Sequence, residues 1–200
     1  MTVYTIYAAT TDGWILSGDA SYALARAGIN FTINTSNVST IIGQRFSGGN
    51  YSVYQGFFQF DTSTVLGLIQ SAVFALYGNG SSAISKTLQA RLSDWGAGLT
   101  TADFIAGASL SALPLLADFN LSGYNASAYN NFTSDPNFIT NINQAGSTRF
   151  LVCAADQTNN VTPVGDEFVN VIAADQTGTS TDPKLTITTY DEFFAKVSSY

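Results

Sequence analysis

The fold class is decided by two neighbouring stretches, YQGFFQFDTS at residues 54–63 and IQSAVFALY at residues 69–77. In an extended chain, Phe58 and Phe60 fall on one face of the first stretch and Phe57 falls on the other. The second stretch alternates in the same way, and both are rich in the aromatic and β-branched residues that suit a half-buried pleated strand. The pattern predicts an all-β protein built as a two-sheet antiparallel β-sandwich.

Short strand-like runs continue through the rest of the chain. They cover residues 3–7, 41–46, 87–92, 149–154, 167–173 and 184–190. About eight to ten strands at such short spacing predict a jelly-roll-like arrangement. No domain boundary or internal repeat interrupts the pattern, so we expect a single β-sandwich domain over residues 1–190. Residues 191–200 then form a C-terminal tail, whose apolar residues follow the spacing of a short amphipathic helix.

The charge content excludes several classes of partner. Charged residues make up only 10% of the 200-residue chain, against about a quarter in an average protein, and the net charge is −7. The seven Lys and Arg residues are spread too thinly to bind a phosphate backbone or an anionic membrane, so we expect no nucleic-acid partner. No apolar run reaches the roughly 20 residues of a membrane-spanning helix, so we expect no membrane insertion.

Catalytic groups are scarce in the sequence. The chain contains no His, and its single Cys153 stands in an apolar run where a buried, inert thiol is expected. The two Glu residues stand in the pairs Asp166–Glu167 and Asp191–Glu192. Adjacent residues of a strand point to opposite faces, so neither pair forms a general acid and base by itself. We therefore expect that the chain is not an enzyme.

A set of short motifs follows one order along the chain. They are TTDGW at residues 10–14 with Ala25-Arg26 after it, FDTS at 60–63, IQSAVFALY at 69–77, DWG at 94–96 and PKLTITTY at 183–190. This order resembles the DNRLRE or disaggregatase-related β-sandwich domains and similar domains of phage structural proteins. The resemblance implies a two-sheet sandwich used outside cells or on a virion surface. Some relatives are carbohydrate-binding modules attached to polysaccharide enzymes.

Composition and resemblance together give the leading functional hypothesis. The polar, weakly charged composition is typical of extracellular proteins, yet the chain begins with Met1 and shows no signal peptide. A virion protein, made in the host cytoplasm without a signal peptide and then exposed on the exterior surface, meets both conditions. We expect a phage capsid decoration, head-fibre or minor capsid component. Its partners would be other virion proteins or further copies of itself.

The alternative hypothesis is a carbohydrate-binding or receptor-binding module at a tail or fibre tip. Its candidate ligand-binding residues are Trp95, Tyr124 and Tyr129, because exposed aromatic rings stack on sugars. For Trp95 the favoured interpretation is a plug at the open end of the sandwich, since large aromatic residues mostly supply buried area. A third hypothesis, a polysaccharide depolymerase, requires two carboxylates that converge in a cleft.

We expect no cofactor other than a candidate structural Ca²⁺ ion at Asp61. Asp61, followed by Thr62 and Ser63, could supply oxygen to a structural Ca²⁺ ion. Such a trio more often ends a strand in an Asx or Ser/Thr turn, and we favour the turn.

Two segments are candidates for contacts with a neighbouring subunit. In the tail, Phe193, Phe194 and Tyr200 either complete the protein's own core or anchor it on a partner. The Asn- and Ser-rich residues 125–143 predict a long loop with a short helical piece, and such length in a compact domain usually serves function or packing.

Overall fold

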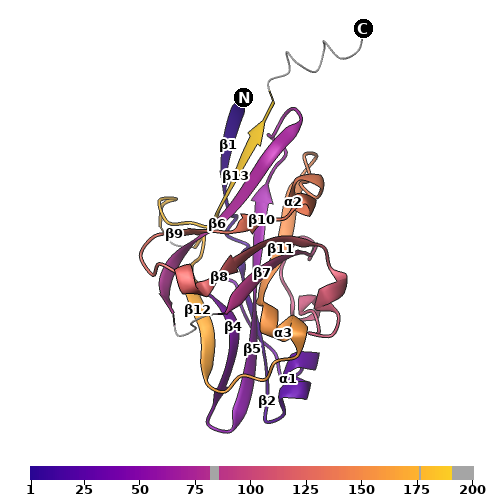
Figure 1. Ribbon diagram of the computed structural model, residues 1–200, viewed down its shortest axis with the longest axis vertical. Helices are drawn as coiled ribbons and strands as arrows, with labels where there is room; N and C mark the ends of the chain where they lie inside the picture. Colours follow the sequence, from indigo (N-terminus) through magenta and orange to yellow (C-terminus); the bar gives the residue numbers. More distant parts are fainter. Residues whose placement is uncertain (82–85, 176, 191–200) are drawn as a thin grey trace.

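The protein is built from antiparallel strands, which confirms the predicted all-β class. The computed structural model describes residues 1–81, 86–175 and 177–190 (Figure 1). The strands are β1 (Thr2–Tyr7), β2 (Gly13–Asp19), β3 (Thr32–Asn34), β4 (Ser39–Ser47), β5 (Asn50–Asp61), β6 (Ile69–Ser81), β7 (Thr87–Leu92), β8 (Leu115–Asn120), β9 (Tyr129–Asn131), β10 (Thr133–Ser134), β11 (Ser147–Ala154), β12 (Asp166–Ile172) and β13 (Lys184–Thr189). The helices are short: α1 (Tyr22–Ala27), α2 (Pro136–Thr140), α3 (Ala155–Asn159), and the 3₁₀ turns η1 (Thr101–Asp103), η2 (Leu110–Ala112) and η3 (Leu121–Gly123).

Strand β5 is the centre of the sheet because its two edges serve three partners. One edge pairs with β2, for example at Trp14 and Gly56. The opposite edge pairs with β4 over residues 50–54 and with β11 over residues 56–61. The sheet therefore divides at β5. One arm continues from β4 through β12, β6 and β13 to β1, and the other from β11 through β7 and β8 to β10.

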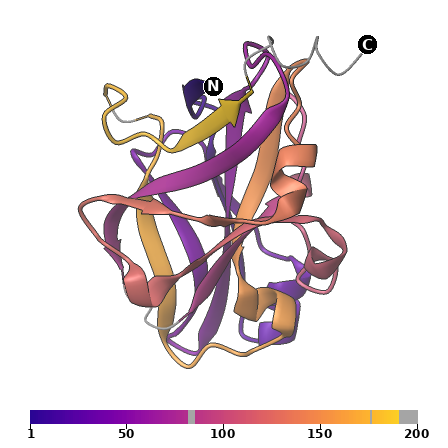
Figure 2. The ribbon, with the colours of Figure 1, turned by 45° about the horizontal axis from the view of Figure 1, so that its top comes forward.

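The two arms curl toward each other, and residues 129–134 connect them (Figure 2). Strand β9 pairs with β6 of the first arm, and β10 pairs with β8 of the second. Between these two strands, the backbone N–H of Phe132 donates to the carbonyl oxygen of Phe74 at 2.9 Å. The curled sheet brings the N-terminus and the end of β13 to the same end of the molecule (Figure 1).

The larger apolar core lies between the two arms. Its aromatic centre is formed by Phe58 and Phe60 of β5, Phe74 of β6 and Phe150 of β11, all fully buried. Their ring centroids lie 4.8–6.4 Å apart, and Phe74 meets Phe150 edge to face. Such pairs add roughly 0.5–1.5 kcal/mol each beyond the burial of their area. Because Phe58 and Phe60 share this core, the predicted alternation of the strand is confirmed.

The second face of β5 is also buried, and here the predicted half-buried strand is wrong. Phe57 and, on β11, Leu151 belong to a separate apolar cluster. The cluster also contains Tyr22 and Ala25 of α1 and several residues of the irregular segment 94–113. This cover comes from parts of the chain whose own pattern is weak. Strand β5 is consequently a central strand with apolar packing on both sides.

The segment predicted as a long loop, residues 125–143, contains two short strands and one helix. Strands β9 and β10 come first, and α2 follows them. Asp135 caps this helix, because its Oδ1 accepts from the backbone N–H of Asn137 at 2.9 Å, and Pro136 occupies the first helical position. The helical piece is therefore confirmed, while the rest is ordered by pairing with β6 and β8.

Candidate functional site

Trp95, the first of the three predicted ligand-binding aromatic residues, lies inside the second apolar cluster. It is 4% exposed and meets Phe57 edge to face at 6.4 Å between ring centroids. The guanidinium carbon of Arg149 lies 5.7 Å from the centroid of its ring. Trp95 thus occupies the position of a plug and offers no exposed ring face to a sugar.

Tyr124 and Tyr129 lie half-buried on the other side of the molecule, beside β6, so the three aromatic residues do not form one site. The Tyr124 hydroxyl donates to the carbonyl oxygen of Asn170 at 2.6 Å, and burial raises its pKa. Tyr129 meets Tyr77 edge to face at 5.2 Å. The Lys184 Nζ lies 3.6 Å from the centroid of the Tyr129 ring. One face of that ring is therefore occupied by an ammonium group.

Asp61, the candidate Ca²⁺ ligand, closes a turn at the end of β5. Its Oδ1 accepts from the hydroxyl of Ser63 at 2.6 Å and from the backbone N–H of Ser63 at 3.1 Å. These two hydrogen bonds lower the pKa of the exposed carboxyl group. Among the residues that the structure describes, no group of three or more His, Cys, Asp or Glu side chains is arranged to hold a metal ion. Asp61 thus has the geometry of the favoured Asx turn.

The predicted interface residues of the tail, Phe193, Phe194 and Tyr200, lie outside the described residues. The described surface at the end of β13 is nevertheless apolar. Five large hydrophobic side chains here are 42–71% exposed, and we call them the apolar tip: Met1, Val3, Leu66, Leu68 and Tyr190.

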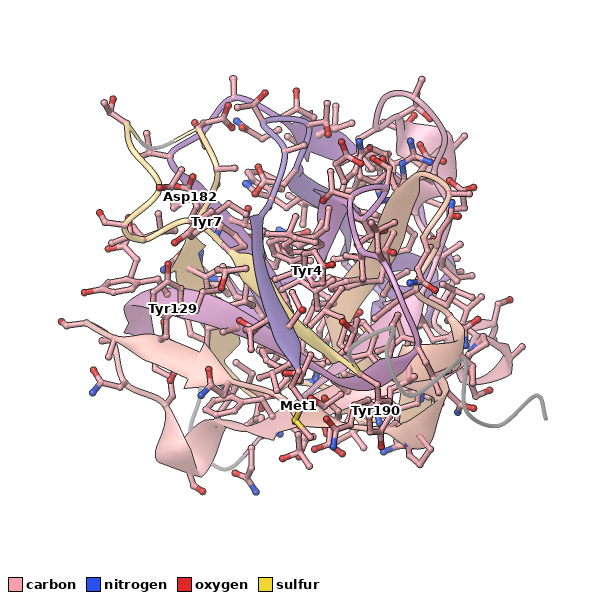
Figure 3. All side chains as sticks on the ribbon, turned by 90° about the horizontal axis from the view of Figure 1, so that it is seen from above. Met1, Tyr4, Tyr7, Tyr129, Asp182 and Tyr190 are labelled. Atoms are coloured by element: carbon pink, nitrogen blue, oxygen red, sulfur yellow. The ribbon has the colours of Figure 1, made fainter. Side chains whose placement is uncertain are left out.

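Backbone contacts hold the members of the apolar tip together. Strand β1 pairs with β13, which brings Thr2 opposite Thr189. The backbone N–H of Tyr190 donates to the carbonyl oxygen of Leu68 at 3.0 Å. The Tyr4 hydroxyl accepts from the backbone N–H of Leu66 at 3.3 Å. Figure 3 shows Met1 and Tyr190 side by side at this end of β1 and β13.

Sequence reasoning missed the loop contribution to the apolar tip. Leu66 and Leu68 flank Gly67 between two strands, where polar turn residues are usual. The presence of two large apolar residues in such a loop was the one signal in the sequence for an apolar surface here. The pattern alone gave no reason to place them beside the first strand of the chain.

An open groove of about 660 Å³ lies between β6 and residues 131–136. Ala72, Val73 and Phe132 form much of its lining. Its one carboxylate, Asp135, is engaged as the cap of α2. The polar residues Ser71, Asn131, Thr133 and Ser134 also line the groove, but its carboxylate is already used as a helix cap, so the lining offers no free charged group to a small-molecule ligand.

Of the reactive groups singled out in the sequence, Asp166, Glu167 and Cys153 lie in the described part of the chain, and Asp191 and Glu192 lie outside it. Asp166 forms an ion pair with Arg45 at 2.7 Å, whereas the adjacent Glu167 turns to Lys86 at 3.2 Å. The two carboxylates therefore point to different partners. Cys153 is buried, and burial raises the pKa of its thiol to about 12. A thiol with this pKa is protonated at neutral pH and is a poor nucleophile.

A buried cluster of hydroxyl and backbone groups closes the sheet where β5 ends and β11 begins. We call it the hydroxyl cluster: Thr62, Thr148, Asn143 and Gly146. The Thr62 Oγ1 lies 2.8 Å from the Thr148 Oγ1, 2.7 Å from the carbonyl oxygen of Asn143 and 2.9 Å from that of Gly146. The Thr148 Oγ1 accepts from the backbone N–H of Asn143 at 2.9 Å. Both hydroxyl groups thus have partners.

Comparison of the chain with known protein families finds no matching family model, and comparison with curated proteins finds no match. Within the ranges that the structure describes, the helices are too short and too polar to cross a bilayer. The functional assignment therefore depends on the geometry of the structure alone. The most distinctive feature of the described surface is the apolar tip.

Proposed function

We propose that this protein is a structural component of a phage virion, a capsid decoration, head-fibre or minor capsid protein on the exterior surface. It acts by protein–protein contact with other virion proteins or with further copies of itself. The apolar tip is the observation that carries this proposal. It forms the contact surface, and the curled sheet presents it at one end of the molecule.

The proposal includes a finer description of the fold, a two-sheet jelly-roll-like sandwich. Two features support it. The arms diverge from β5 and enclose the larger core between them, as the two layers of a sandwich do. The arms also consist of antiparallel strands whose neighbours are mostly distant in sequence, for example β4 with β12 and β13 with β6, as in jelly rolls.

The chemistry of the tip favours a protein as its partner. Contiguous exposed apolar patches on soluble proteins commonly mark interaction sites, and large hydrophobic residues act as anchors there. The tip combines aliphatic side chains with the Tyr190 ring. Since only 10% of all residues are charged, a contact of this kind would depend little on ionic strength.

The first test is whether the protein sits in a purified phage particle. Mass spectrometry of the particles would measure its copy number, and electron cryomicroscopy would locate it. We expect a stoichiometric position on the exterior, with the apolar tip against a neighbouring subunit. Absence from the particles would overturn the virion role.

A pair of matched variants tests the role of the tip itself. Leu68 is 71% exposed within the tip, and Val164 is 88% exposed in the turn before β12. Leu68→Glu should weaken incorporation into particles about tenfold or more, because the new charge would be buried without a partner at the contact. Val164→Glu should leave incorporation unchanged. Equal incorporation of both variants, with unchanged melting temperatures, would exclude the tip as the contact surface.

The carbohydrate-binding or receptor-binding module stays as the alternative proposal. Its remaining candidates are Tyr124 and Tyr129 on the surface beside β6, because Trp95 is buried. A glycan array probed with the purified protein tests it. Specific binding that Tyr129→Ala abolishes, together with absence from particles, would favour this alternative.

A further inference from the structure

Three segments that are distant in sequence meet beside the turn between β1 and β2. The turn contains Asp12, the second segment follows β12, and the third precedes β13 and contains Asp182. The backbone N–H of Ala174 donates to the Asp12 Oδ2 at 3.0 Å. The backbone N–H of Ala8 donates to the carbonyl oxygen of Pro183 at 2.8 Å. These bonds fix the three segments against one another.

Four side chains at this meeting point have a buried oxygen atom without a hydrogen-bond partner, and we call them the acidic junction. The atoms are Oδ1 of Asp12, Oδ2 of Asp175, Oδ1 of Asp182 and Oγ1 of Thr11. Asp12 is fully buried, and Asp182 is 5% exposed. Nearly all buried polar atoms in proteins have a partner. Four of the nine such atoms among the described residues belong to this one meeting point, which points to a partner from outside the chain.

The negative charge of the acidic junction is not compensated within the described residues. Burial raises the pKa of Asp12 to about 7, and the nearby carboxylates of Asp175 and Asp182 contribute to the rise. Burial also raises the pKa of Asp175 and of Asp182. None of the ion pairs among the described residues involves these three carboxylates. Lys184, which follows Asp182 closely in sequence, lies over the Tyr129 ring.

The side chain that bonds to Asp182 is a phenol, Tyr129. Figure 3 shows Asp182, Tyr7 and Tyr129 on the same side of the molecule. The Tyr129 hydroxyl donates to the backbone carbonyl oxygen of Asp182 at 2.9 Å and leaves its carboxylate unpaired. The carboxylate of Asp182 contributes to the raised pKa of Tyr129, which burial dominates. A buried carboxylate without an ion pair needs either a proton or a bound cation.

The unpartnered atoms of the acidic junction are all oxygens, from three carboxylates and one hydroxyl. The three carboxylates are not arranged to hold a metal ion as a group, so only two of them are assigned as ligands. Ca²⁺ accepts about six to eight oxygen ligands in irregular geometry, whereas Zn²⁺ favours nitrogen and sulfur. We propose that the acidic junction binds one Ca²⁺ ion, with Asp12 Oδ1 and Asp182 Oδ1 as its carboxylate ligands. The Thr11 hydroxyl and water molecules complete the shell, and Asp175 adds negative charge beside the ion.

Such an ion would connect the start of the chain to its end. It would join the turn before β2, which pairs with the central strand β5, to the segment before β13 in the first arm of the sheet. An ion that binds only the folded protein stabilises it by mass action. The inference is independent of the proposed virion role.

The test is a Ca²⁺ titration of the full chain, freed of metal with EDTA and dialysed to pH 7.5. Melting temperatures are measured against CaCl₂ concentration for the unmodified protein and for Asp12→Asn, Asp182→Asn, Asp61→Asn and Asp118→Asn. Asp118, half-buried on β8 in the other arm, is the matched control for loss of one negative charge. Asp61→Asn tests the site that the sequence suggested. Isothermal titration calorimetry gives the stoichiometry.

We expect Ca²⁺ to raise the melting temperature of the unmodified protein saturably, by roughly 5–10 °C at a hundredfold excess over Kd, with one ion bound. Asp12→Asn and Asp182→Asn should lose this shift, and the other two variants should keep it. A shift that persists in Asp12→Asn, or one lost only in Asp61→Asn, would overturn the assignment. So would the absence of any shift with CaCl₂.

A second measurement guards against variants that simply fail to fold. In EDTA at pH 8, Asp12→Asn should melt at a higher temperature than the unmodified protein, because the substitution removes a buried, repelled charge. Asp118→Asn should leave the melting temperature unchanged. If Asp12→Asn lowers the melting temperature in EDTA, the Asp12 Oδ1 has a partner within the chain and the proposed site is wrong.

Discussion

The protein has two buried polar clusters at strand ends, and they differ in how their atoms find partners. The hydroxyl cluster at Thr62 is neutral, and its hydroxyl groups bond to each other and to main-chain atoms. The acidic junction at Asp12 is anionic, and four of its oxygens have no partner. The difference shows that hydroxyl groups can complete each other, since each both donates and accepts, whereas ionised carboxylates only accept. Carboxylates brought together in a buried place therefore need a proton or a bound cation.

The largest expected effect concerns the charge of Asp12. In metal-free protein, raising the pH from about 4 to about 8 should cost roughly 4 kcal/mol of unfolding free energy through this group alone. The native pKa of about 7 exceeds the ordinary value of 3.8, so the native state binds the proton more tightly across this window. This stabilisation is complete below pH 4 and is lost as the pH rises through 7. Urea unfolding of the unmodified protein and Asp12→Asn at several pH values measures it, and parallel pH profiles would contradict it.

Loss of a polar atom from the hydroxyl cluster should destabilise the protein, whereas loss of the Asp12 charge should stabilise it. Thr62→Val keeps the shape of the side chain and removes the hydrogen bond between the Thr62 and Thr148 hydroxyl groups, together with the contacts of Thr62 Oγ1 to the carbonyl oxygens of Asn143 and Gly146. We expect a loss of about 2 kcal/mol of unfolding free energy, measured by urea unfolding. Thr64→Val, two residues further on at an exposed position, is the matched control and should change little. A loss at Thr62 no greater than at Thr64 would mean that the cluster contributes nothing.

A double-mutant cycle sharpens the contrast. Thr62 and Thr148 bond directly at 2.8 Å, so the effects of Thr62→Val and Thr148→Val should not add. We expect a coupling energy of about 1 kcal/mol, because either substitution alone already removes the hydrogen bond between the two hydroxyl groups. Strict additivity in the four unfolding curves would show that the two hydroxyl groups act separately.

The smallest effect is expected at Asp61, an exposed acidic residue with satisfied hydrogen bonds. Asp61→Asn should change the unfolding free energy at pH 7 by less than about 0.5 kcal/mol, since the amide oxygen can still accept from Ser63. A much larger change would show that exposure and local hydrogen bonding do not describe the role of this residue.

The alternation of residues was enough to predict the strands but not their surroundings. Residues 87–92 were predicted as a strand, and β7 covers the same residues. The burial of Phe57 was not predictable in this way, because its cover comes from α1 and from residues 94–113, which carry no clear period. Alternation reports that two faces differ, and it does not report what distant segments bring to the second face.

The candidate sites were less predictable, for a related reason. Asp12 stands in the motif TTDGW, and Asp182 directly precedes the motif PKLTITTY. Nothing local indicates that residues 170 positions apart share a buried place. The apolar tip was missed because Leu66 and Leu68 belong to a loop, and their neighbour Tyr190 is more than 100 residues away. Both sites exist because the strand topology brings segments that are distant in sequence together.

The three-way pairing of β5 has a consequence for how the chain reaches its native state. Its register depends on β2, about 40 residues before it, and on β11, about 90 residues after it, with Phe58 opposite Phe150. Pairings of such high sequence separation make folding slow, on the order of milliseconds to seconds. During synthesis, the larger core cannot close until β11 has left the ribosome. Until then the face of β5 that carries Phe58 and Phe60 lacks its contact with Phe150 of β11, which leaves an apolar strand face open to aggregation and to chaperones.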